Sequence, residues 1–168
     1  DEIFVNTLKD NILRNNFTIF KNEKGINFSG KKYDATHFFK NLNNDNKKKI
    51  LSEKFNGKIN FKIDEIVSEN EPLFDFVGSG KIRSGKFHKL TAKANYSDDE
   101  LLDVLIDSID NNKKKLTVNS DRAEPFIKNY KFIKGFQEGN LEYTSNYYDT
   151  NSKSNLKLYD FKLQDVPV

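Results

Sequence analysis

The chain of 168 residues contains no cysteine, no methionine and no tryptophan. Without cysteine it can form no disulfide, thiolate metal site or cysteine nucleophile. A chain without methionine cannot be a complete translation product, so we expect a processed or excised piece of a longer protein. No apolar run is longer than three residues. A membrane-spanning helix needs about twenty, so any membrane anchor or export signal is expected outside this segment.

The charge balance does not indicate a charged binding partner. Lys and Arg number 28 against 25 Asp and Glu, for a net charge of +3. Nucleic-acid binders usually concentrate basic charge on one surface, so we do not expect a nucleic-acid partner. Two basic triplets, Lys47 to Lys49 and Lys113 to Lys115, stand beside Asn and Asp in turn-like sequence. We interpret them as solvated loops, with contact to an anionic surface as the weaker alternative.

No group of residues has the spacing of a catalytic, metal or cofactor site. His37 and His88 have no Glu or His nearby at metal-ligand spacing, so we expect ordinary surface or hydrogen-bonded histidines. Ser120-Asp121 lacks the Gly-x-Ser-x-Gly elbow and a histidine partner, which makes a helix cap the better interpretation. Gly78-Ser79-Gly80 lacks the Gly-Lys-Ser/Thr ending of a phosphate loop. The sequence therefore predicts a protein that is not an enzyme.

Aromatic and β-branched residues alternate with polar ones along most of the chain, which has fifteen Phe and seven Tyr. Alternation with a period of two is typical of strands with one apolar and one wet face, and the intervening Gly, Asn and Asp clusters predict hairpin turns. Near the C-terminus the alternation of Leu156 and Leu158 is resumed by Phe161 and Leu163 one position out of step. Two β-like runs therefore join around Tyr159-Asp160.

Short helices are expected at two places. Asp34 can cap the first, which would carry Phe38, Phe39 and Leu42, and residues 46–55 extend or follow it. Ser120 or Asp121 can cap the second, with Pro125 in its first turns and an apolar face formed by Phe126, Ile127 and Tyr130.

Residues 97–116 fit two structures. Ser97 and Glu100 have the spacing of a helix capping box, and the following Leu and Ile residues form a helical stripe. Leu102, Val104 and Ile106 also alternate, and an Asp-Asn-Asn turn follows them, as in a hairpin. Local signals alone favour the helix.

The C-terminal third, LTVNSDRAEPFIKNYKFIKGFQEGNLEYTSNYYDTNSKSNLKLYDFKLQDVPV, resembles the C-terminal part of the AsmA-like family. The family pattern is a strand ending in Ser-Asp, a short helix, a Gly-containing hairpin and a closing strand. Residues 120–123, 138–141, 160–161 and 165–167 match these pieces in order. The sequence departs from the family at Arg122-Ala123-Glu124, where Asp-Ala-Gly is usual, so the entry into the helix is expected to differ.

Two upstream segments are similar to the family as well. GINFSGKKYDATHFF matches a strand followed by a helix start at Gly30 and Asp34, and SGKFHKLTAKANY matches the strand pair before the Ser-Asp element. The resemblance covers most of the chain beyond about Gly25. Its register makes Leu101 to Leu116 a hairpin, and we adopt the hairpin over the helix.

The resemblance implies a fold and a function. Residues 1–168 would be one segment of an AsmA-like protein: a mainly β, curved antiparallel sheet of six or more strands that forms an open groove or half-barrel with one or two short helices. Such proteins are anchored in the bacterial inner membrane and expose a periplasmic β-groove, which is thought to carry phospholipid towards the outer membrane. The implied partners are phospholipid acyl chains and neighbouring segments of the parent chain.

The alternation then predicts which residues form the apolar interior. We name them the predicted groove residues and expect them to share one concave face: Ile59, Phe61, Ile63, Leu90, Ala92, Ala94, Leu116, Val118, Leu141, Tyr143, Leu156 and Leu158.

Other interpretations remain open for the same residues. Any alternating strand can pack into an ordinary dry core without ligand, and for a single residue this is the better expectation. A surface-exposed adhesin module and a structural spacer are both compatible with the composition. Copurified phospholipid would distinguish a groove from either.

Overall fold

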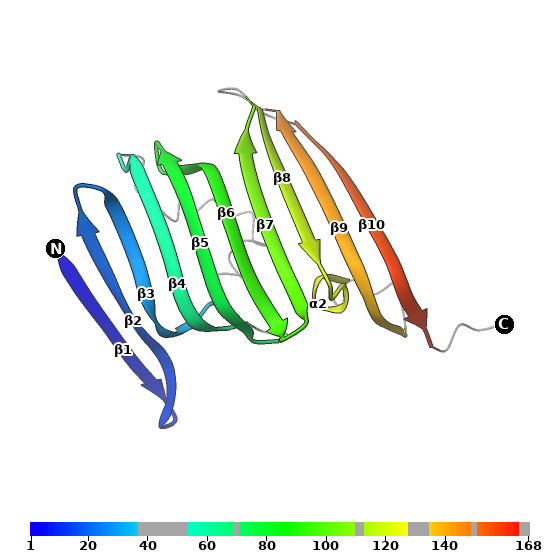
Figure 1. The fold of residues 1–168 in the computed structure, drawn as a ribbon, viewed down its shortest axis with the longest axis horizontal. Coiled ribbons are helices and arrows are strands. Elements are labelled where there is room, and N and C mark those ends of the chain that lie inside the picture. Colours follow the sequence, from blue (N-terminus) through cyan, green and yellow to red (C-terminus); the bar gives the residue numbers. More distant parts are fainter. Residues whose placement is uncertain (37–53, 69–70, 110–112, 128–134, 149–150, 165–168) are drawn as a thin grey trace.

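The computed structural model describes residues 1–36, 54–68, 71–109, 113–127, 135–148 and 151–164. Within them ten strands form one sheet in chain order, with β1 at one edge and β10 at the other (Figure 1). The strands are β1 (Glu2–Lys9), β2 (Ile12–Asn22), β3 (Gly25–Asp34), β4 (Gly57–Val67), β5 (Leu73–Arg83), β6 (Lys86–Ser97), β7 (Glu100–Ser108), β8 (Lys113–Ser120), β9 (Phe136–Tyr148) and β10 (Asn151–Leu163). A short helix, α2 (Glu124–Ile127), lies beside the ends of β8 and β9.

The sheet is open, and its neighbouring strands run antiparallel except for β3 and β4, which are parallel. A parallel pair needs a connection that returns along the full strand length, whereas antiparallel neighbours can be joined by short turns. The connection from β8 to β9 is longer and contains α2. The predicted fold class is confirmed: the chain is mainly β, with a large open sheet and very little helix. No described helix has the length and hydropathy needed to cross a membrane.

The hairpin prediction for residues 101–116 is confirmed. These residues form β7 and the first half of β8, with Ile106 paired to Leu116 and Val104 to Val118. The apparent capping box serves the turn between β6 and β7 instead, because Ser97 Oγ donates to Glu100 Oε2 at 2.9 Å.

The predicted helices have different outcomes. The second helix is present but short, since α2 covers only Glu124–Ile127 and Tyr130 lies outside the described residues. Near the first, the Thr36 amide donates to Asp34 Oδ1 at 3.0 Å, as in a helix cap. Phe38, Phe39 and Leu42 fall outside the described residues, as do Lys47 to Lys49.

Three details of the chain differ from the sequence interpretation. Lys113 to Lys115 begin strand β8 rather than forming a loop. The first two strands were not predicted. The break in alternation near the C-terminus falls inside one strand: Tyr159 pairs with Asn140 and Phe161 with Glu138, and Asp160, opposite Gly139, has φ of 55°. Glu138 and Gly139 also have positive φ, so the backbone of both strands is distorted at this point without a change of register.

Two apolar clusters stabilise the sheet. The larger joins strands from β2 to β6 and is built from Phe17, Ala35, Ile63, Ile66, Leu73, Ala94 and Tyr96. The smaller joins α2 to β9 and consists of Ala123, Ile127 and Leu141, with Phe136 and Leu158 packed against it. Both clusters include predicted groove residues, so part of the apolar face is packed by the protein itself.

Candidate functional site

One row of uncharged residues crosses all ten strands. Successive cross-strand pairs connect its members, so their side chains stand on one face of the sheet, which we call the apolar face. This central row consists of Ile3, Ile19, Phe28, Phe61, Gly78, Ala92, Val104, Val118, Tyr143 and Leu156. With strands about 4.8 Å apart, its nine intervals span roughly 43 Å.

The predicted groove residues all lie on this face. Five belong to the central row. Ile59, Leu90 and Leu116 form a second row that continues through Gly80 and Ile106. The remaining members are Ile63, Ala94, Leu141 and Leu158, on the opposite side of the central row. The strand registers thus place on one face residues that are up to ninety-nine positions apart in the sequence, from Ile59 to Leu158.

Their accessibility is uneven. Ile59, Ile63, Ala92, Ala94 and Leu141 are buried, with at most 5% of their surface exposed. Leu156 is 47% exposed, and the other predicted groove residues are half-buried. At the opposite edge, Ile3 is 58% exposed. The positions beside the central row are therefore mostly packed, whereas the central row itself is half-buried except at the buried Ala92 and at its exposed margins on β1 and β10.

A hollow of about 290 Å³ lies where the central row passes from β4 to β6. Phe61, Gly78 and Ala92 line it together with adjoining residues of β5 and β6. Gly78 and Ala92 are the two smallest members of the central row, and the space is adjacent to them. Small-molecule sites begin at about 300 Å³. The hollow can hold a short ligand segment rather than a whole phospholipid.

A small polar cluster interrupts the apolar face on β9 and β10. Ser154 Oγ lies 3.0 Å from the Tyr143 hydroxyl and 2.9 Å from Ser145 Oγ. The hydrogen bond with Ser154 lowers the pKa of Tyr143. Since Ser145 is fully buried, this bonding satisfies a hydroxyl that would otherwise be costly on an apolar face.

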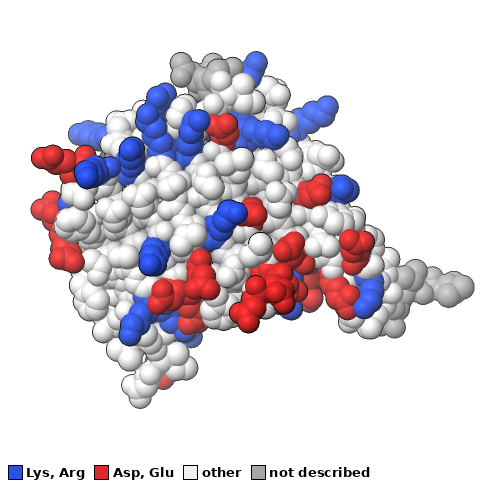
Figure 2. Space-filling model, in the orientation of Figure 1, with Lys and Arg blue, Asp and Glu red and all other residues white. Residues whose placement is uncertain are grey.

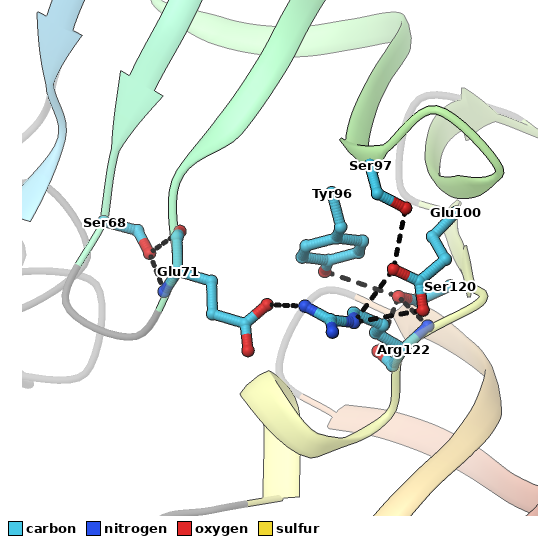
Figure 3. Close-up of polar contacts among 7 residues, drawn as sticks. All are labelled: Ser68, Glu71, Tyr96, Ser97, Glu100, Ser120 and Arg122. Atoms are coloured by element: carbon cyan, nitrogen blue, oxygen red, sulfur yellow. Dashed lines mark hydrogen bonds and ion pairs between the residues drawn. The ribbon is translucent and has the colours of Figure 1, made fainter.

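A second polar cluster holds three chain connections together at one end of the sheet (Figure 3). The Arg122 guanidinium pairs with Glu71, which precedes β5, and its Nε lies 3.1 Å from each carboxylate oxygen of Glu100 at the start of β7. Ser120 Oγ donates to the Arg122 carbonyl at 2.6 Å and accepts from the Arg122 amide at 3.2 Å. Burial by itself would lower the pKa of Arg122, but Glu71 and Glu100 outweigh it and raise the pKa overall.

This arrangement gives the unusual Arg122 a structural role. Its guanidinium is the cation between two glutamates, Glu71 and Glu100. An aspartate at this position would place three carboxylates together, which is unfavourable. Asp121 stabilises the same end of the sheet, because its Oδ2 accepts a hydrogen bond from the Leu101 amide at 2.9 Å. We interpret the cluster as a clamp on the turns, not as a reactive site.

The structure offers no metal centre in the part of the chain that it describes, since no three His, Cys, Asp or Glu residues gather there. His88 is half-buried on β6, and His37 lies outside the described residues. Gly78-Ser79-Gly80 runs through strand β5 and does not form a loop.

Comparison with known proteins gives no relative. The chain matches no family model, and neither the curated proteins nor the solved structures include a significant match. The AsmA-like resemblance therefore stays a prediction.

Some residues of the apolar face were missed by the sequence interpretation. Val104 and Ile106 belong to it, and their alternation was visible but competed with a helical stripe. Ile3 and Ile19 lie on β1 and β2, where neither strand was predicted.

Proposed function

We propose that this chain shelters phospholipid acyl chains against the apolar face of its sheet and catalyses no reaction. The continuous central row carries the proposal, because it offers an uncharged track through every strand from Ile3 to Leu156. In the proposed setting the chain is a periplasmic segment of a longer, inner-membrane-anchored protein that moves lipid between membranes or maintains the outer membrane.

The dimensions of the row support a track rather than one fixed site. A bilayer core of about 30 Å contains two opposed acyl chains, so one chain extends roughly 15 Å. The row is nearly three times as long. Each methylene removed from water contributes about 0.8 kcal/mol, so retention needs no bond to a head group. A chain could therefore slide along the row, with the hollow beside Phe61 and Ala92 as one resting place.

A second function is favoured by the burial of the centre. Ile59, Ala92 and Ala94 are as inaccessible as ordinary core residues. A spacer or adhesion module with a dry core would show the same burial, and it would bind no lipid. The two functions differ at the exposed margin of the apolar face, where Leu156 lies.

Extraction of the purified chain and mass spectrometry of the extract test the proposal. Wild type is expected to carry phospholipid. Leu156→Asp should lose much of it, because a carboxylate would stand on the track, and the 47% exposure of Leu156 lets the variant fold. Phe61→Asp places the charge beside the hollow and should be more severe.

The matched control is Asn155→Asp, which puts the same carboxylate one residue away on the opposite face of β10. It should retain lipid. Absence of lipid from wild type, or equal loss in Leu156→Asp and Asn155→Asp, would contradict the proposal and favour the spacer or adhesion module.

A further inference from the structure

The polar face of the sheet carries a row of cations at one end. Cross-strand pairs connect its members from β4 to β10, and we name it the cationic row: Lys58, Lys81, Lys89, Asp107, Lys115, Asn146 and Lys153. Its lysines are exposed. Asp107 is the one carboxylate in the row, and it pairs with Lys89 at 3.3 Å.

Further cations stand beyond this row at the same end. Arg83 pairs with Lys86 across the hairpin of β5 and β6, and Lys113 begins β8. Figure 2 shows the result, with Lys and Arg along the upper end of the sheet. Two independent hairpins thus place basic residues at the same end, and the row across the strands joins them.

The opposite end is acidic. Asp98 and Asp99 form the turn before Glu100 at the start of β7, and Glu71 and Asp121 lie beside it, with Arg122 paired to Glu71 and Glu100. Figure 2 shows acidic side chains gathered along this lower end. The small net charge of +3 therefore conceals a separation of charge along the strands.

Positive charge at this end also contributes to lowered pKa values of two nearby side chains. His88 has a lowered pKa, through burial and then through Arg83, Lys114, Lys81 and Lys89. Lys114 also has a lowered pKa, through burial and then through Lys86. His88 and Lys114 are in phase with Leu90 and Leu116 and therefore stand on the apolar face, so positive charge gathers at this end on both faces of the sheet.

We propose that this basic end docks on a membrane surface rich in anionic phospholipid. The cationic row spans six strand intervals, roughly 29 Å, which suits an extended surface of head groups. The acidic end would be repelled by the same surface, so the charge separation fixes which end approaches. The proposal concerns the polar face and would stand even if the apolar face held no lipid.

A nucleic acid fits the same charge less well. Single-stranded nucleic acid is bound by basic grooves that alternate with aromatic platforms for the bases. The cationic row includes no aromatic side chain, and beyond the row the Tyr148 ring lies 5.9 Å from Lys113 Nζ. Surface attraction through head-group charge needs no such platform.

Sedimentation with vesicles tests the proposal. The chain should bind vesicles of phosphatidylcholine and phosphatidylglycerol, release them in about 0.5 M salt, and ignore pure phosphatidylcholine. The triple variant Lys81→Ser, Lys89→Ser, Lys115→Ser should bind roughly 100-fold more weakly, at about fivefold for each charge lost.

The control removes the same charge from the same face. Lys62→Ser, Lys93→Ser, Lys157→Ser changes a row four residues further along the strands, roughly 13 Å away and beyond a Debye length. It should keep most of the vesicle binding. Equal losses in the two triple variants, salt-independent binding, or binding of a single-stranded oligonucleotide without binding of anionic vesicles would overturn the proposal. Unchanged melting temperatures show that both variants are folded.

Discussion

Removal of the Arg122 side chain is a direct test of the clamp that joins three turns. Arg122→Ala would leave the Ser120 hydrogen bonds in place, because these use the backbone of residue 122. It would remove the pairs to Glu71 and Glu100, and leave the two glutamates close together without their cation. The variant therefore isolates the ionic part of the cluster.

The magnitude follows from how exposed the partners are. The side chains of Arg122, Glu71 and Glu100 are 39%, 32% and 34% exposed, so solvent screens their attraction. Exposed pairs are worth about 0.2–1 kcal/mol each, and fully buried ones cost about 3–5 kcal/mol when broken. Two partly exposed pairs, one with Nε near both carboxylate oxygens, should give about 1–2 kcal/mol. For a chain of this length the melting temperature should fall by about 3–6 °C.

Thermal and urea unfolding followed by circular dichroism measure this change. The control is Lys93→Ala, which breaks a single pair to Asp103 at 3.3 Å with side chains 64% and 40% exposed, and should cost less than about 0.5 kcal/mol. In about 1 M salt the difference between the two variants should shrink. If Arg122→Ala costs no more than Lys93→Ala in low salt, the clamp interpretation is wrong.

Two further predictions concern packing and pH. Gly30→Ala should destabilise the sheet by about 1–3 kcal/mol in urea unfolding, because an added Cβ would meet the backbone of Asn16 and Phe17. Gly78→Ala, whose nearest contact would be 3.3 Å, should cost less, and the reverse order would contradict the packing argument. Burial raises the pKa of Tyr96 above 10.0, so the unfolded chain loses this proton first and stability should fall as the pH rises above about 10. Tyr96→Phe should show a smaller fall between about pH 9 and 11, and an identical pH profile would count against the assignment.

Much of the sheet was predictable because its information is local. Ala92, Ala94 and Leu90 alternate with polar residues on β6, and the structure keeps that phase on one face. The break before Phe161 also marked a real feature, since Asp160 and the facing Gly139 have positive φ at this point of the β9 and β10 pair. Residue pattern is sufficient wherever one face is apolar and the other wet.

Other features depend on contacts that no local pattern records. β1 has exposed side chains on both faces, with Ile3 at 58% and Phe4 at 64%, so its alternation carries little information about burial. The parallel pairing of β3 with β4 depends on where the chain returns after residue 34. The Arg122 clamp joins residues 71, 100 and 122, and its members become neighbours only when three separate turns meet at one end.

The separation of charge was predictable from the sequence once the order of the turns in the sheet is considered. In an antiparallel meander, successive turns lie at alternate ends of the sheet, so every second turn lies at the same end. From β5 onward the turns are alternately basic, at Arg83 to Lys86, then acidic, at Asp98 to Glu100, then basic again where Lys113 to Lys115 begin β8. A helix over residues 101–109 would have removed this alternation. The hairpin interpretation and the basic end are therefore linked: the same strand pair that aligns Val104 with Val118 on the apolar face brings Lys115 beside Asp107, in one row with Lys89, on the polar face.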